Sequence, residues 1–368
     1  MVAVRLIDLR NQEMEIFLAS PRGFCAGVRR AVESLRTALD RVTTPLYVYN
    51  EIVHNRHVVA EFSDRVQFVR KVESVPIGAT LLISAHGVAP KVHRQATARN
   101  LRVLDATCPL VTRLHELARR FAADGYHILL IGHQGHDEVI GVQGEAPGSI
   151  HVVLRPEDVN AVTVANPDRV AWLTQTTLSV QQVEQIVPIL KERFPKIVGP
   201  FDGTTHERTG NLCYATQNRQ EVIRQFAPQC DRVVVVGSPN SSNSCRLAET
   251  AEIAILEADG KANKRPLTAS QLQSLAEARS HSKLVDDAGE LDRNWFLDKD
   301  LRPINRVLLT AGASAPERLV QECIVWFTTQ FDAQLTPATL LEETTRFPLP
   351  ESLTSLDRSD LPKNELLL

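Results

Sequence analysis

The stretch Ile16-Phe-Leu-Ala-Ser-Pro-Arg-Gly-Phe-Cys-Ala-Gly-Val-Arg-Arg30 contains the pattern on which the rest of the chain is built. A short apolar run ends at Pro21, Cys25 follows a polar turn, and the next apolar residues recur at helical spacing. The pattern predicts a strand, a turn and a helix, with a thiol at the turn. A helix N-terminus carries unpaired N–H groups and partial positive charge, which favour a thiolate there. A single cysteine of this kind is more often simply buried, so a functional thiol is indicated only if the pattern recurs.

The order of apolar run and polar turn does recur along the chain. The further runs predicted to form strands are 45–49, 79–84, 101–105, 127–131, 170–173, 232–236 and 306–310. Several are followed by helical patterns, and strands alternating with helices indicate an α/β fold with mostly parallel sheets. Ligands bind at the carboxyl ends of the strands in such sheets. The roughly even spacing predicts three similar α/β modules whose loops face a common centre.

The length of 368 residues is too great for one ordinary core, so two or three domains are expected. We expect a first module over 16–108, a second over 109–208 and a third over 209–331. The polar segment 257–283 is expected to be a surface insertion in the third module. Residues 332–368, rich in Pro, Thr, Ser and Glu, are expected to form an extended C-terminal tail.

The composition is that of an ordinary soluble protein, with 43% hydrophobic and 23% charged residues. A net charge of -3 argues against a general nucleic-acid or membrane-surface binder. No apolar run approaches the roughly 20 residues of a membrane span. The first 15 residues lack the apolar core of a signal peptide. We therefore expect a cytoplasmic protein with neither a nucleic acid nor a membrane as partner.

The six cysteines are far apart in the sequence, without a C-x-x-C pair, which makes a disulfide framework or a zinc ribbon a poor interpretation. Metal or cluster ligation and simple burial remain. Cys25, Cys108 and Cys213 lie at predicted strand ends or helix starts, and three thiolates on separate loops suit an iron–sulfur cluster with one iron that lacks a cysteine ligand. Such an open iron can bind a substrate oxygen as a Lewis acid. Burial is the usual fate of the cysteines in or beside helical patterns, which are Cys230, Cys245 and Cys323.

Several polar side chains follow the predicted strands and form a candidate cradle for an anionic ligand. They are His54, His86, His136, Ser241, Ser242, Asn243 and Ser314. A lone histidine is more often structural, but here several lie at successive strand ends. Asn243 and Ser314 are candidate helix N-caps, and helix N-termini favour phosphate groups. Neither a Walker P-loop nor G-x-G-x-x-G occurs, so nucleotides are not the expected ligands.

Glu138 is the carboxylate within the predicted His-Gly loops that can serve as a proton donor. The alternative interpretation is an ordinary solvated loop glutamate.

A set of motifs resembles, in order, those of the 4-hydroxy-3-methylbut-2-enyl diphosphate reductases, the family of the last enzyme of the non-mevalonate isoprenoid pathway. The motifs are Pro21-Arg-Gly-Phe-Cys-Ala-Gly-Val28, Glu51-Ile-Val-His-Asn-Arg56, Ser84-Ala-His-Gly-Val88, Asp105-Ala-Thr-Cys-Pro-Leu-Val-Thr112, Thr174-Gln-Thr-Thr-Leu-Ser179, Phe194-Pro-Lys-Ile-Val-Gly-Pro200, Cys213-Tyr-Ala-Thr216, Asn218-Arg-Gln220, Asn240-Ser-Ser-Asn-Ser244 and Thr310-Ala-Gly-Ala-Ser-Ala-Pro316. The resemblance extends from about residue 16 to residue 331.

This resemblance implies a trefoil of three α/β modules around a 4Fe–4S cluster held by Cys25, Cys108 and Cys213. In the family the substrate hydroxyl binds the open iron, the residue matching Thr176 contacts that hydroxyl, and the residue matching Glu138 delivers a proton. The positions matching those that hold the diphosphate are His54, His86, His136, Ser241, Ser242, Asn243 and Ser314.

The reaction implied by the resemblance uses two electrons and two protons to remove the hydroxyl as water through an allyl-type intermediate. The products are isopentenyl and dimethylallyl diphosphates, and the implied electron donor is a protein such as ferredoxin or flavodoxin. Departures from the family pattern are local: Asp137 stands where a proline is expected, and the loop over 201–211 is longer.

Two alternatives belong to other functional classes. A cluster with an open iron also suits a non-redox hydro-lyase acting on a small phosphorylated or anionic substrate, and such an enzyme needs no reductant. A cluster in a sensor or a binding protein is the second alternative, and such a protein binds no small diphosphate.

Overall fold

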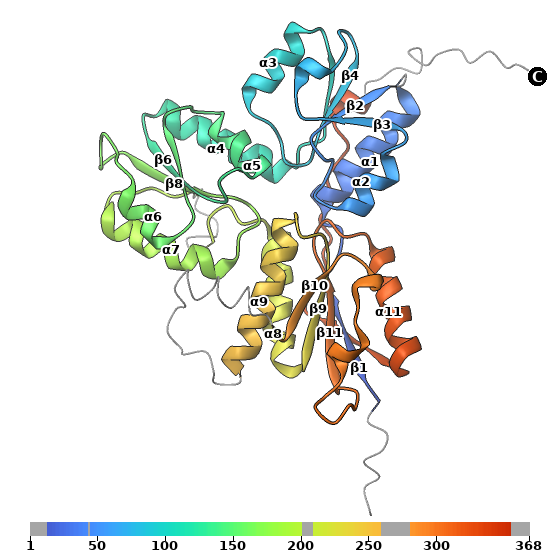
Figure 1. The fold of residues 1–368 in the computed structure, drawn as a ribbon. Coiled ribbons are helices and arrows are strands. Elements are labelled where there is room, and N and C mark those ends of the chain that lie inside the picture. Colours follow the sequence, from blue (N-terminus) through green and yellow to red (C-terminus); the bar gives the residue numbers. More distant parts are fainter. Residues whose placement is uncertain (1–12, 43–44, 201–208, 259–279, 355–368) are drawn as a thin grey trace, which may run out of the picture.

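The computed structural model describes residues 13–42, 45–200, 209–258 and 280–354. Three sheets form three lobes around a common centre, and the paired strands within each sheet are parallel (Figure 1). This arrangement confirms the predicted α/β trefoil with mostly parallel sheets. Of the helices in the described part of the chain, none is long and apolar enough to cross a membrane.

The first sheet has the strand order β3-β2-β4-β5 and is covered by helices on both faces. Leu82 of β4 packs into the core on one face, whereas its neighbours Leu81 and Ile83 pack into the core on the other. Such double-sided burial is typical of parallel sheets. The elements are α1 (Ala26–Arg41), β2 (Leu46–Tyr49), α2 (Arg56–Phe62), β3 (Val66–Val69), η1 (Val72–Ser74), β4 (Thr80–Ile83), α3 (Pro90–Ala98) and β5 (Arg102–Asp105).

The second sheet has the order β7-β6-β8. Leu129 and Ile131 of β6 pack on one face of this sheet, and Ile128 and Leu130 pack on the other. The elements are α4 (Pro109–Ala123), β6 (His127–Ile131), α5 (Asp137–Gln143), β7 (Ile150–Val153), α6 (Pro156–Ala161), β8 (Val170–Thr174) and α7 (Val180–Arg193).

The third sheet has the order β10-β9-β11-β1-β12 and includes both the first and the last strand of the described residues. Its central strands are buried on both faces, as in the run Val233–Val236. The elements are β1 (Glu15–Ser20), α8 (Tyr214–Phe226), η2 (Ala227–Gln229), β9 (Arg232–Val236), α9 (Ser242–Ala258), β10 (Ser282–Val285), η3 (Ala288–Glu290), η4 (Arg293–Phe296), β11 (Arg306–Ala311), α11 (Glu317–Phe331) and β12 (Gln334–Thr339).

All eight strands predicted from the sequence are present, and four further strands were missed. The missed strands are β3, β7, β10 and β12, and each lies at the edge of its sheet. An edge strand exposes one side to solvent and needs no continuous apolar run. β12, for example, has most of its residues exposed or partly exposed, so its sequence carries little signal.

The position of β1 departs from the expected division of the chain. Residue 16 was expected to open the first module, but β1 pairs with β11 and β12, with Ile16 opposite Val307 and Leu335. The expected start of the first module is therefore wrong for this strand, because its apolar residues are buried between two strands from the far end of the chain. The other module limits stay a prediction.

The expected C-terminal tail also contains regular structure, namely β12 and α12 (Glu351–Thr354). The tail was therefore wrongly expected to be extended throughout, since its weak sequence signal hid an edge strand. The expected insertion over 257–283 lies largely outside the described residues, but its ends belong to α9 and β10.

Candidate active site

One cavity lies where loops from all three lobes meet, and it is lined by all twelve residues singled out from the sequence. They are Cys25, His54, His86, Cys108, His136, Glu138, Thr176, Cys213, Ser241, Ser242, Asn243 and Ser314. Most of these residues follow the carboxyl ends of parallel strands, which open toward the centre, and Cys213 directly precedes α8. The convergence is a finding of the structure, whereas the role of each residue stays a prediction.

The three cysteines of the cavity are the N-cap residues of three helices. Cys25 caps α1 and its Sγ accepts a hydrogen bond from the Val28 N–H at 3.4 Å. Cys213 caps α8 and accepts from the Thr216 N–H at 3.4 Å, and Cys108 caps α4. Gly27 leaves room for the sulfurs, because a Cβ there would lie 2.5 Å from Cys108 Sγ and 3.9 Å from Cys25 Sγ.

Burial opposes the thiolate form that the helix N-termini favour. Burial, and next the neighbouring Cys25, raise the pKa of Cys108 to about 12 and that of Cys213 to about 11. A positively charged metal centre would offset this cost, because metal binding deprotonates thiols. Ligands of one shared metal ion lie close together. The sulfurs of Cys25, Cys108 and Cys213 do not all lie within 4.8 Å of one another, so they do not meet this requirement. The donor set therefore fits a polynuclear cluster better than a single ion.

The other three cysteines lie in different surroundings. Cys230 and Cys323 are buried in two hydrophobic cores of the third lobe. Cys245 lies in α9, where its Sγ donates to the Pro239 carbonyl at 3.2 Å. That these three cysteines take no part in holding a cluster stays a prediction.

The three histidines form a second compact group in the lining of the cavity, which we call its histidine end, as distinct from the cysteine end. The His54 and His86 rings stack with centroids 3.9 Å apart, and the His136 ring stands edge-on to them at 5.3 and 6.0 Å. Burial, and next the neighbouring His54, lower the pKa of His136 to about 3 and that of His86 well below its ordinary value. Both rings are therefore neutral near pH 7 in the unliganded protein.

His54 contacts residues from all three lobes. The Ser314 hydroxyl donates to the His54 carbonyl at 3.0 Å, and Glu51 Oε2 lies 3.5 Å from its Nδ1. Asp137 Oδ2 lies 3.9 Å from its Nε2. His54, His86 and Asp137 are also a group whose ligand atoms lie within 4.8 Å of one another and could bind a metal ion. Asp137, the departure from the family pattern, thus lies beside the histidine cluster.

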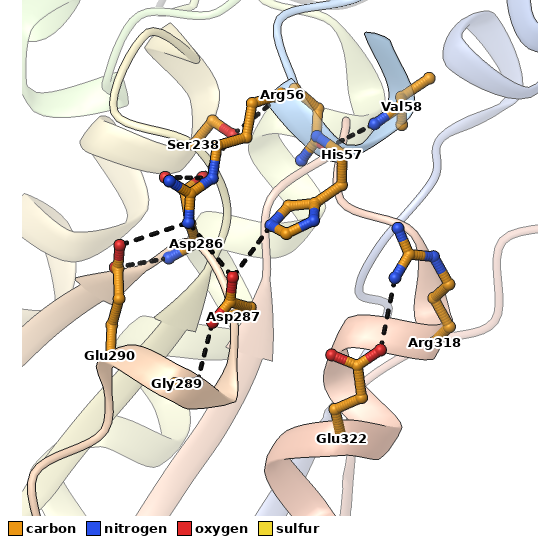
Figure 2. Close-up of polar contacts among 11 residues, drawn as sticks. Arg56, His57, Val58, Ser238, Asp286, Asp287, Gly289, Glu290, Arg318 and Glu322 are labelled. Atoms are coloured by element: carbon orange, nitrogen blue, oxygen red, sulfur yellow. Dashed lines mark hydrogen bonds and ion pairs between the residues drawn. The ribbon is translucent and has the colours of Figure 1, made fainter. Parts of the chain in front are cut away.

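The residues that follow His54 are tied to the third lobe by ion pairs, as Figure 2 shows. Arg56 Nε lies 3.1 Å from Asp286, and the Arg56 and His57 side chains each lie 3.2 Å from Asp287. The Ser238 hydroxyl donates to Asp286 and accepts from the Arg56 N–H. This network joins the loop of His54 to the loop that leads to Ser241.

The hydroxyl and amide groups of the third lobe are also fixed by hydrogen bonds. Ser241 Oγ lies 3.2 Å from Ser314 Oγ, and Asn243 Oδ1 accepts from the Ala313 N–H at 2.8 Å. The predicted N-cap roles of Asn243 and Ser314 are wrong. Asn243 lies inside the first turn of α9, and Pro316 is the N-cap residue of α11, because both helices begin away from these side chains.

Glu138 is buried with only 2% of its surface exposed, so its interpretation as a solvated loop glutamate is wrong. Both of its oxygens accept hydrogen bonds from Thr176, at 2.7 Å from the N–H and 2.9 Å from the hydroxyl. Burial raises the pKa of the Glu138 carboxyl above its ordinary value, despite the lowering effect of these bonds. The pair thus places a carboxyl that retains its proton readily against a hydroxyl in the cavity.

Sequence reasoning missed two polar residues that line the cavity. Thr177 Oγ1 lies 3.1 Å from Ser242 Oγ, and Thr216 Oγ1 lies 3.1 Å from Cys213 Sγ. The run of three polar residues directly after β8 was a signal for Thr177. Thr216 could have been found from its place three residues after the capping Cys213. Apolar side chains, among them Val53 and Leu110, complete the lining and suit a hydrocarbon group.

Comparisons with known proteins agree with this geometry. The family model described as LytB protein matches residues 16–258 and 263–328. A relative from Rhodococcus opacus (strain B4), named 4-hydroxy-3-methylbut-2-enyl diphosphate reductase, is 47% identical over 342 residues, which cover 93% of this chain and 91% of the relative. A relative of the same name from Nocardia farcinica (strain IFM 10152) is 45% identical over 93% of this chain and 92% of its own length.

Solved structures show the same likeness. The E-1-hydroxy-2-methyl-but-2-enyl-4-diphosphate reductase from Plasmodium falciparum superposes with a TM-score of 0.79 and 32% identity, covering 93% of this chain and 97% of the other. A structure titled (E)-4-hydroxy-3-methyl-but-2-enyl diphosphate reductase, the terminal enzyme of the non-mevalonate pathway, has a TM-score of 0.55 and 27% identity over 86% of this chain and 99% of its own. With the family model matching most of its length and these relatives close over nearly all of it, the chain belongs to the LytB protein family.

Proposed function

We propose that the protein reduces 4-hydroxy-3-methylbut-2-enyl diphosphate to isopentenyl and dimethylallyl diphosphates. The observation that carries the proposal is the single cavity lined by three capping cysteines, a histidine cluster and the Glu138–Thr176 pair. Membership of a family whose relatives bear the reductase name supports the same reaction.

The cofactor in this proposal is a 4Fe–4S cluster held by Cys25, Cys108 and Cys213. Three partly buried thiols at three helix N-termini fit it, because each thiolate gains stabilisation from the helix end and from the iron. When bound, such a cluster supplies electrons one at a time and an iron position not filled by the protein. The proposed electron donor is a small redox protein such as ferredoxin or flavodoxin, and the proposed location is the cytoplasm.

The diphosphate is proposed to lie at the histidine end of the cavity. His54, His86 and His136 supply ring N–H donors there. The neutral state of His86 and His136 in the unliganded protein leaves these two rings able to accept protons when the anion binds. Hydroxyl and amide donors complete this end of the cavity, namely Ser241, Ser242, Asn243 and Ser314. The hydrocarbon part then lies beside Val53 and Leu110, which exclude water.

Proton supply is assigned to Glu138. Thr176 orients the substrate hydroxyl, while its own hydroxyl donates to Glu138 Oε2 at 2.9 Å. The hydroxyl leaves as water after it takes up one proton, a second proton goes to carbon, and two electrons balance the reaction. Because burial raises the pKa of the Glu138 carboxyl and so favours its protonated form, Glu138 is suited to deliver one of these protons.

An anaerobic assay with the substrate and a chemically reduced electron donor tests the proposal. We expect both diphosphate products, and no turnover when the reductant is omitted. Turnover without a reductant would support a hydro-lyase instead. Cluster binding without any turnover or diphosphate binding would support a sensor or a structural cluster.

A further inference from the structure

The C-terminal segment 340–354, which we name the C-terminal strap, connects two lobes of the protein. It follows β12 of the third sheet, where the Leu340 N–H donates to the Ser20 carbonyl at 3.1 Å. It ends at α12, whose Leu353 is fully buried in a core that also contains residues of α1. The strap lies beyond residue 328, where the match to the family model ends, and none of the twelve site residues belongs to it.

Glu343 of the strap binds a fully buried arginine of the helix that Cys213 caps. Arg219 Nη1 donates to Glu343 Oε1 at 2.9 Å, and Arg219 Nη2 donates to Glu343 Oε2 at 3.2 Å. Arg219 Nη2 also donates to the carbonyl of Gly23 at 2.8 Å, and Gly23 lies two residues before Cys25. Arg219 therefore joins three segments: the helix of Cys213, the loop of Cys25 and the strap.

A second arginine makes the corresponding connection on the other side. Arg30 lies in α1, the helix capped by Cys25. Its Nη1 donates to the carbonyl of Thr107 at 2.7 Å, and Thr107 directly precedes Cys108. Its Nε donates to the Pro348 carbonyl of the strap, also at 2.7 Å. Arg30 therefore joins the helix of Cys25, the loop of Cys108 and the strap.

We infer that the C-terminal strap fixes the relative positions of the three cysteines through these two arginines. A buried guanidinium that loses its carboxylate is left as an uncompensated charge, so Arg219 depends on Glu343 to remain beside Gly23. Groups that orient metal ligands without touching the metal commonly determine how tightly it is held. Glu343 and Arg219 are positioning residues in this sense. The inference rests on the proposed function in one respect, that the three cysteines hold the cluster.

The primary test replaces Glu343 with Gln and compares it with a matched control, Glu342→Gln, at the exposed neighbouring position. Glu343→Gln keeps the size of the side chain but removes the charge that Arg219 needs. We expect its retention of iron against a chelator to fall by about 10–100-fold, the usual effect of losing such a partner. Glu342→Gln should retain iron as the unmodified protein does, and Glu343→Asp should restore part of the loss.

A second measurement uses the apoprotein and does not depend on catalysis. Thiol-labelling rates, with each modified cysteine identified by mass spectrometry, should rise at Cys25 and Cys213 in Glu343→Gln and remain unchanged at Cys323. A protein truncated after Thr354 should behave as the full chain, whereas Arg30→Gln should raise labelling at Cys108.

The outcomes separate this inference from the proposed function. If the unmodified protein binds a cluster but does not reduce the substrate, the proposed function fails and the strap inference still stands. If Glu343→Gln lowers the unfolding temperature while iron retention and thiol labelling stay unchanged, the strap is only a stabilising element and the inference is wrong. Equal losses in Glu342→Gln and Glu343→Gln would overturn it as well.

Discussion

The cysteines of the cavity lie at helix N-caps, whereas His54 lies in a loop tied down by side chains from other lobes. Main-chain N–H groups three residues along the chain contact the sulfurs of Cys25 and Cys213. His54 depends instead on Ser314, Glu51 and Asp137, and on the ion pairs of the residues after it. One end of the cavity is thus part of the helical framework, and the other is assembled from contacts between lobes.

This difference leads to different expectations for substitutions. At the cysteine end each sulfur has one fixed position, so replacing any one of these sulfurs should abolish cluster binding completely. At the histidine end many hydrogen bonds contribute to binding of the diphosphate, so replacing one side chain should weaken this binding only in part.

The largest effect is expected at the cysteine end. Serine at Cys25, Cys108 or Cys213 should destroy the cluster, because an alkoxide is a poor replacement for thiolate on iron. Serine at Cys323 should leave the cluster in place at a stability cost of about 1–3 kcal/mol for a buried hydroxyl. Iron and sulfide content and the visible spectrum of anaerobically purified variants measure the outcome. Loss of iron in Cys245→Ser but not in Cys213→Ser would contradict the ligand assignment.

The second-largest effect is expected at Glu138. Glu138→Gln keeps the shape of the side chain but cannot deliver a proton, so kcat should fall by about 10²–10⁴-fold while KM changes little. Because burial raises the pKa of Glu138, the active protonated form should persist above the usual titration range of glutamate and be lost as the pH rises through that raised pKa. A pH profile of kcat measures this loss. Equal turnover of the Glu and Gln proteins would place the proton donor elsewhere.

A smaller effect is expected at the histidine end. His54→Ala removes a donor to the diphosphate worth roughly 1–3 kcal/mol, so KM should rise about 5–150-fold with a smaller change in kcat. His93→Ala, outside the cavity, is the control. An unchanged substrate affinity would show that His54 does not contact the diphosphate.

The smallest effect is expected in the network that holds the His54 loop. Asp286→Asn weakens the pair with Arg56, whose side chain is 56% exposed, so KM should rise by less than about tenfold. The effect should shrink at high salt, because the exposed charge of Arg56 is screened. Glu322→Gln breaks the exposed Arg318–Glu322 pair of Figure 2 and should leave KM unchanged. Equal changes in both variants would mean that the network does not position His54.

The sequence predicted the α/β fold and twelve of the residues that line the cavity. Eleven of these were predicted from strand ends and helix starts, which are local patterns, and Thr176 was predicted from the resemblance to a known family. It did not predict the partners that position them. Asp286 and Arg56 are 230 places apart by number and carry no shared pattern. Arg219 stands inside a quoted motif, but its contact with Glu343 depends on where the chain end returns. The place of β1 was missed for the same reason, since pairing between distant strands leaves no mark in either one.

The position of β1 between β11 and β12 affects the order in which parts of the protein can fold during synthesis. β1 lies between β11 and β12, and Glu15 contacts Arg306, which is 291 residues later in the chain. During synthesis β1 therefore waits for almost all of the other described strands before it finds its neighbours, and such distant pairing is intrinsically slow. Cys25 follows β1 directly, so its final position is also set late. Iron delivered to a nascent chain would meet an incomplete set of ligands, and cluster assembly should follow release of the finished polypeptide.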